Sequence, residues 1–110
     1  MKKDTEQKIG QLQMFEQSMQ NFLLQKQQLQ AQLIELESAL KELKTKNEAY
    51  KIVGNIMVAS KKDELEKDLN TKKETIQLRI KTLEKQENTI KDKAQTLQKE
   101  VMKELSEKKK

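Results

Sequence analysis

Residues 50–59, with the sequence YKIVGNIMVA, constrain the fold of this chain more than any other stretch. Apolar and β-branched residues lie on both sides of a central Gly54-Asn55 pair, with no helical period. A Gly-Asn pair between two such runs indicates a two-residue β-hairpin, because glycine accepts the positive φ angle that primed turns require. The long stretches before and after it are helical in character, so the hairpin is expected to reverse the chain near its middle.

The stretch before the hairpin, residues 4–47, carries a heptad repeat. With Leu12 at position a, the a and d positions form an apolar row that only Lys26 and Asn47 interrupt. The a positions are Leu12, Met19, Lys26, Leu33, Leu40 and Asn47, and the d positions are Phe15, Phe22, Leu29, Leu36, Leu43 and Tyr50. A sustained seven-residue repeat keeps one stripe facing a partner and predicts a coiled-coil helix. Lys26 either fixes the register of that coiled coil or extends its amine to solvent.

The stretch after the hairpin, residues 61–107, predicts a second helix. Ser60 is expected to cap its start, with Asp63 at the capping-box spacing. One apolar row has members seven residues apart, and Lys73 and Glu87 interrupt the adjoining row. The first row is Leu69, Ile76, Leu83, Ile90 and Leu97, and the second includes Ile80, Ala94 and Val101.

The two helical stretches match in length, and a tight turn joins them. They are therefore expected to pair antiparallel, closing on each other's apolar rows. The predicted fold is mainly α, a long antiparallel coiled-coil helical hairpin with one central β-hairpin, in a single domain over residues 1–110. A parallel dimer of one continuous helix is the competing architecture, and the β-rich break at residues 50–59 argues against it.

The β-hairpin is predicted to be an assembly surface, because both of its faces are largely apolar. A lone two-stranded hairpin is marginal in water, and its two open edges are templates for pairing with other chains. The predicted assembly residues are Tyr50, Ile52, Val53, Gly54, Asn55, Ile56, Met57 and Val58.

Composition excludes several classes of function. The 110 residues include no Cys and no His, and no Gly-rich phosphate loop occurs, so no catalytic site, metal site or cofactor is expected and the protein is not expected to be an enzyme. The net charge of +5 is spread over alternating acidic and basic residues, with a single Arg at position 79, which does not favour nucleic acid. No apolar run approaches the roughly 18 residues of a membrane span. A soluble cytoplasmic protein that binds no membrane is therefore expected.

The hairpin sequence YKIVGNIMV and residues 78–87, LRIKTLEKQE, together with the glutamine-rich first helix, resemble the β-type subunits of the prefoldin family, in their archaeal form. The resemblance covers essentially the whole chain. It implies a heterohexamer of two α-type and four β-type subunits, in which the hairpins build a β-barrel between subunits and the coiled coils hang from it. It also implies an ATP-independent chaperone, a holdase that captures unfolded client proteins and delivers them to a group II chaperonin.

The resemblance further implies that clients are contacted at the distal tips of the coiled coil. The residues predicted for this role, here called the tip set, are Ile9, Leu12, Met14, Phe15, Met19, Val101, Met102 and Leu105. Ile9, Met14, Met102 and Leu105 fall outside the apolar rows, so packing is not expected to account for them. The roles of four further residues outside the rows stay open between a neighbouring subunit, a cavity and solvent: Leu23, Leu24, Ile34 and Leu78.

The alternative function is a structural coiled-coil spacer or adaptor without chaperone activity. A spacer accounts for the heptads. It does not account for a hairpin that is apolar on both faces.

Overall fold

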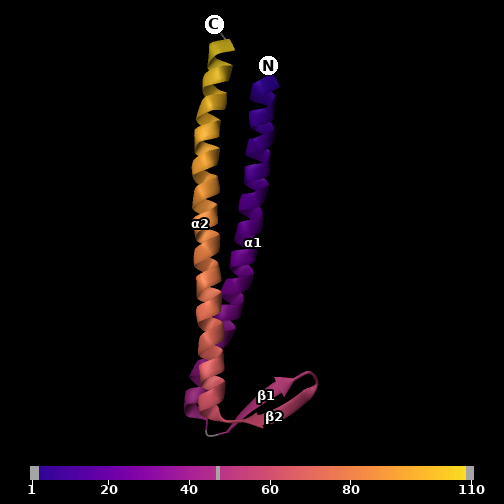
Figure 1. Ribbon diagram of the computed structural model, residues 1–110, viewed down its shortest axis with the longest axis vertical. Coiled ribbons are helices and arrows are strands. Elements are labelled where there is room, and N and C mark those ends of the chain that lie inside the picture. The colour runs from indigo at the N-terminus through magenta and orange to yellow at the C-terminus, as the bar shows by residue number, and fades with distance from the viewer. Residues whose placement is uncertain (1–2, 47, 109–110) are drawn as a thin grey trace. The chain divides into compact units, whose positions relative to one another are not determined.

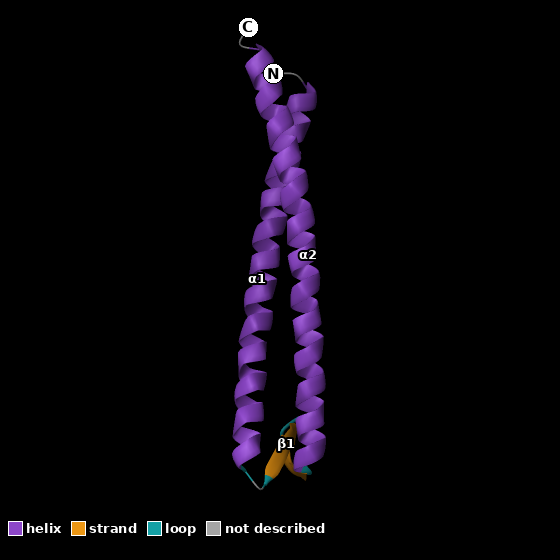
Figure 2. Ribbon diagram, turned by 90° about the vertical axis from the view of Figure 1, so that its left-hand side faces the viewer, coloured by secondary structure: helices purple, strands orange, loops and turns teal. Residues whose placement is uncertain are grey.

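The fold consists of two long helices joined by one β-hairpin. The computed structural model describes residues 3–46 and 48–108. The elements follow in the order α1 (Lys3–Thr45), β1 (Ala49–Val53), β2 (Ile56–Ser60) and α2 (Lys62–Lys108), as Figures 1 and 2 show. The predicted mainly α fold, with two long helices and a single hairpin, is confirmed.

The helix ends agree closely with the sequence signals. Acidic residues occupy the first turns, Asp4 and Glu6 in α1 and Asp63 and Glu64 in α2, where negative charge complements the positive end of the helix dipole. Lys44 lies in the last turn of α1. The observed bounds differ from the expected ones by one or two residues, which is ordinary for helix ends. Asn47, expected at the end of the first helix, lies outside the described residues.

The start of α2 differs from the prediction. Ser60 does not cap this helix, because it is the last residue of β2 and pairs with Ala49 across the hairpin. The backbone N–H of Leu65 donates to the carbonyl of Lys61 at 3.0 Å, so Lys61 takes the N-cap position. The predicted capping box of Ser60 and Asp63 is therefore wrong, because the β-ladder extends one residue pair further than the sequence pattern indicates.

The turn of the hairpin depends on Gly54. The ladder closes at the Val53–Ile56 pair, which leaves Gly54 and Asn55 as a two-residue turn. Gly54 has a φ of 61°, whereas no described residue other than glycine has a positive φ. A positive φ at the first central position alone defines a type II′ turn, the type that favours glycine at this position.

Replacing Gly54 by alanine is expected to destabilise the hairpin by about 1–2 kcal/mol, because a Cβ atom is strained at this backbone conformation. Gly10→Ala is the matched control. It removes the other glycine of the chain from within α1, and is expected to stabilise the protein by about 0.5–1 kcal/mol. An added Cβ meets no atom within 4 Å at either position. A steric clash therefore contributes to neither of the two stability changes. Urea unfolding at a fixed protein concentration measures both effects, and equal effects of the two variants would contradict the role given to φ.

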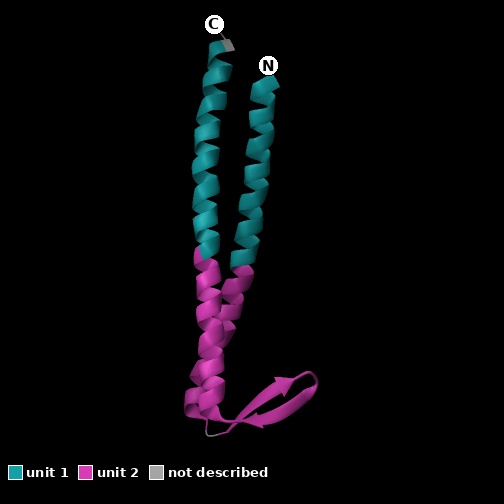
Figure 3. Cartoon of the chain, viewed as in Figure 1, with its two compact units in different colours: residues 1–26, 82–110 teal, residues 27–81 magenta. Residues whose placement is uncertain are grey.

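The chain falls into two compact units. Unit 1 consists of residues 1–26 and 82–110, and unit 2 of residues 27–81 (Figure 3). In unit 1, Lys26 lies beside Glu87 and Thr5 beside Glu104, so the two helices run antiparallel there. The same holds in unit 2, where Lys73 lies near Glu37 and Lys62 donates to the carbonyl of Lys44. The grouping of residues 1–110 into one domain stays a prediction.

The core of each unit is built from the predicted apolar rows. The buried apolar residues are Leu83 and Val101 in unit 1, and Leu40, Leu43 and Ala49 in unit 2. All but Ala49 belong to the a and d positions of the first helix or the two rows of the second. The heptad pattern therefore determines which face of each helix is buried.

Candidate assembly and client-binding surfaces

The hairpin presents apolar residues on both faces. Directly opposed residues of an antiparallel pair share a face. Ile52 therefore lies beside Met57 on one face, and Val53 beside Ile56 on the other. The large apolar residues of the predicted assembly set are all exposed, with Ile52 at 69%: Tyr50, Ile52, Val53, Ile56, Met57 and Val58. Within unit 2, the hairpin extends to one side of the helices (Figure 3).

The edges of this sheet are also open. Among the described residues, β1 and β2 form a two-stranded sheet in which each pairs only with the other. The outer edge of each strand thus offers backbone N–H and C=O groups for a further strand. An exposed apolar patch bounded by such edges is typical of an interaction site. The hairpin has the chemistry to bury its faces and complete its edges against another chain.

The tip set lies entirely in unit 1, but its members differ in exposure. Val101 is buried, and Leu12, Phe15 and Met19 are half-buried, as expected for residues of the apolar rows. Met14 and Met102 are exposed, at 67% and 62% of their surface. These two methionines are the members that packing leaves free for contact with another molecule.

Ile9 and Leu105 are half-buried rather than exposed. The expectation that packing does not account for them is therefore wrong. Counting heptads from Leu12, and from the rows of the second helix, places both residues at position e, which adjoins the apolar rows. A side chain at e can cover the edge of the helix–helix contact, so these two residues widen the buried stripe in unit 1.

A polar cluster in unit 1 was not predicted from the sequence. Thr5 is buried, with 2% of its surface exposed, and its Oγ1 donates to Glu104 Oε2 at 2.5 Å. Lys8 Nζ donates to Glu104 Oε1 at 2.6 Å and lies 3.4 Å from Glu100 Oε2. The heptad register contained the signal: Thr5 lies seven residues before Leu12, Lys8 seven before Phe15, and Glu104 seven after Leu97. The repeat therefore continues beyond its last apolar members as a polar layer.

The cluster raises the pKa of Lys8 above its ordinary value. The main cause is the hydrogen bond to Glu104. Loss of solvation opposes it, and the negative charges of Glu104 and Glu100 add to it. The charged form of the lysine is thus favoured in the folded chain.

This shift predicts how the stability of unit 1 depends on pH. Because the pKa of Lys8 is raised on folding, its contribution is fully present below the unfolded pKa of about 10.4 and is lost as the pH rises through the higher folded pKa. Lys8→Gln removes the charge but keeps a hydrogen-bonding side chain. The stability difference between the wild type and this variant is expected to be constant at neutral pH and to shrink in strongly alkaline solution. Urea unfolding of both proteins across this pH range measures the difference in stability. The other lysines titrate in both proteins, so their effects cancel. A stability difference that grows with pH would contradict the role given to Lys8.

Three of the residues that interrupt the apolar rows, Lys26, Lys73 and Glu87, form ion pairs across the helices. Lys26 Nζ lies 2.8 Å from Glu87 Oε1, with side-chain exposures of only 18% and 19%. Lys26 therefore does not extend its amine to solvent. Lys73 Nζ lies 3.9 Å from Glu37 Oε1 in a more exposed pair.

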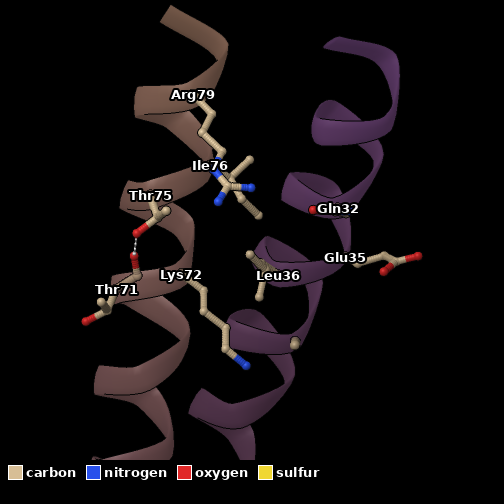
Figure 4. A pocket seen from close by; sticks show the side chains of 9 residues that line it. Gln32, Glu35, Leu36, Thr71, Lys72, Thr75, Ile76 and Arg79 are labelled. Atoms are coloured by element: carbon tan, nitrogen blue, oxygen red, sulfur yellow. Dashed lines mark hydrogen bonds between the residues drawn. The ribbon is translucent and has the colours of Figure 1, made fainter. Parts of the chain in front are cut away.

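A groove of about 570 Å³ lies between α1 and α2 in unit 2. Figure 4 shows Leu36 and Ile76 facing each other across it, and the backbone carbonyl of Thr71 accepting a hydrogen bond from Thr75 Oγ1 at 3.0 Å. Glu35, Lys72 and Arg79 are among its other lining residues. None of the lining residues is buried, so this is the open furrow of a two-helix coiled coil.

The four residues whose roles the sequence left open are all exposed: Leu23, Leu24, Ile34 and Leu78. Within the described part of the chain, no group of three or more His, Cys, Asp or Glu side chains is placed to hold a metal ion. No helix in residues 3–46 or 48–108 is long and apolar enough to cross a membrane.

Comparison with known proteins assigns this architecture to a family. The prefoldin subunit family matches residues 6–108. The prefoldin subunit beta of Archaeoglobus fulgidus is 42% identical over 95 residues, covering 83% of this chain and 82% of the relative. That of Pyrobaculum islandicum is 41% identical over 91 residues, covering 80% and 73%.

A solved structure agrees with these relatives. The crystal structure of the prefoldin beta subunit from Thermococcus strain KS-1 matches with a TM-score of 0.88 and 31% identity, over 94% of each chain. Prefoldin subunits are chaperones and not enzymes, in accordance with the prediction from composition. Family match, sequence identity and fold lead to one assignment: the chain belongs to the prefoldin family, among its beta-type subunits.

Proposed function

We propose that this chain is one of four β-type subunits that assemble with two α-type subunits into a cytoplasmic, ATP-independent holdase. The complex captures unfolded client proteins at the tip set of each coiled coil and passes them to a group II chaperonin. The observation that carries the client-binding part is the exposure of Met14 and Met102, outside the apolar rows of unit 1.

The hairpin supports the assembly part of this proposal. Its six large apolar residues are exposed, and its two outer strand edges pair with no further strand within the described chain. Closing several hairpins into a barrel removes the edges and buries the faces together. A spacer that works as a single helical hairpin would leave this surface in water.

The chemistry of the tips supports capture of many different clients. Methionine is unbranched and polarizable, so it adapts to varied apolar surfaces. A groove of about 370 Å³ in unit 1 adds further apolar surface, since Phe15 and Leu97 line it together with Gln11, Asp92, Lys93, Thr96 and Glu100. Apolar groups flanked by charges suit an unfolded segment, which carries both.

The test replaces the two exposed methionines by serine in one chain, Met14→Ser with Met102→Ser. The apparent affinity for a chemically denatured client is expected to fall by about tenfold or more, equivalent to a loss of about 1.4 kcal/mol. Suppression of client aggregation over a range of chaperone concentrations measures it. Native mass spectrometry of the variant is expected to give the wild-type assembly, because neither residue is buried in the core.

The matched control is the double variant Ile34→Ser with Leu78→Ser, which removes two equally exposed apolar residues from unit 2. It is expected to retain client capture. An equal loss in both double variants would show that capture is not confined to the tips. Full capture by the methionine variant would overturn the assignment of the tip set, and a wild-type chain that never protects a client would favour the spacer.

A further inference from the structure

We propose that Lys26 and Glu87 determine which helices of the chain pair with one another, and in which register. Each residue interrupts an apolar row of its own helix. The fold brings the two interruptions together in unit 1, with opposite charges 2.8 Å apart.

Because the two side chains are largely buried, each charge needs the opposite charge beside it. Less than a fifth of either side chain is exposed. Glu87 Oε1 is buried and accepts no hydrogen bond of good geometry from the described residues, so the charge of Lys26 is what compensates it. A buried charge that loses its partner is strongly destabilising, whereas the intact pair adds little stability over apolar residues of similar size. Such a pair therefore acts mainly against arrangements that would separate the two charges.

Pairing between copies of the chain is one such arrangement. If two α1 helices met in parallel register, Lys26 would face the Lys26 of the second copy, and two α2 helices would likewise bring their Glu87 residues together. The apolar rows do not exclude these pairings, because leucine, isoleucine, methionine and phenylalanine at a and d pack in many combinations. The repulsion between like charges opposes both pairings.

A shift of register is the other arrangement. The heptad repeat allows α2 to slide past α1 by seven residues with its apolar rows still matched. The neighbours of Glu87 in its row are Ile80 and Ala94, so either shift would place Lys26 against an apolar residue and leave both charges unpaired. Lys73 and Glu37 are farther apart and more exposed, so they oppose such shifts less strongly.

The experiment measures pairing directly in the full chain. Because the sequence has no cysteine, Gln20→Cys and Gln95→Cys introduce two unique, exposed labelling sites in unit 1. Nitroxide labels at both sites, diluted with unlabelled chain, report the distances within one chain. A label at position 20 alone, undiluted, reports α1 helices of two copies that pack at an interaxial distance of about 10 Å.

Three variants at positions 26 and 87 distinguish an effect on which helices pair from an effect on the stability of the fold. The apolar variant Lys26→Leu with Glu87→Leu is expected to melt at or above the wild-type temperature, yet to show a broadened or second distance within the chain, or short distances between copies. The swapped variant Lys26→Glu with Glu87→Lys keeps the pair and is expected to retain the single wild-type distance. Lys26→Glu alone is expected to lower the melting temperature and broaden the distance, and adding Glu87→Lys restores both.

An apolar variant with one narrow wild-type distance and no contact between copies would overturn the proposal, whatever its melting temperature. If that variant does not remain soluble, the charge reversals decide. Failure of Glu87→Lys to restore the distance in the Lys26→Glu background would overturn the proposal equally.

Discussion

Replacing Ile52 and Met57 by aspartate is expected to abolish assembly and to leave both helices folded. These residues are opposed on one face of the hairpin, and both are exposed in the single chain. Two carboxylates placed there would be buried without partners on assembly, at a cost of about 3–5 kcal/mol each. Native mass spectrometry is expected to show the loss of the complex, and the far-ultraviolet circular dichroism is expected to remain helical.

The matched control keeps the same positions apolar, with Ile52→Val and Met57→Leu. This variant is expected to assemble, because changes that nearly conserve volume cost little in an apolar contact. A complex of wild-type mass formed by the aspartate variant would show that this face of the hairpin is not the assembly surface.

Replacing Leu83 by alanine is expected to have the largest effect on the stability of unit 1. Leu83 is only 9% exposed, and truncation of a buried leucine costs about 2–5 kcal/mol through lost burial and the cavity left behind. Leu78 lies five residues earlier in the same helix and is 66% exposed. Leu78→Ala is therefore the control, with an expected change within about 0.5 kcal/mol.

Urea unfolding of both alanine variants, at one protein concentration, compares them. Similar losses from the two variants would contradict the assignment of Leu83 to the buried row and Leu78 to the exposed side of α2. A large loss from Leu78→Ala alone would show that Leu78 packs against another chain in the assembled state, which the single chain does not contain.

The heptad repeat made most of the helical core predictable. Periodicity identifies the buried face of a helix without knowledge of its partner, which is why Leu40, Leu43, Leu83 and Val101 were all found in the predicted rows. The Gly54-Asn55 turn was equally predictable from the sequence, because so few residues accept a positive φ.

Other features depend on how far one helix is displaced along the other, which no single heptad pattern determines. The meeting of Lys26 with Glu87 is one such feature, and the polar layer of Thr5, Lys8 and Glu104 is another. Ser60 was mispredicted for a different reason, since a strand and a helix cap compete for the same residue and the ladder pair with Ala49 decides between them.

The native mass and subunit composition of the complex that this chain forms in its own cells would decide whether the proposed hexamer exists. We expect a particle of six chains, four copies of this one and two of an α-type subunit. A monomer or simple dimer with no second kind of subunit would contradict it, because the exposed hairpin would then remain in water.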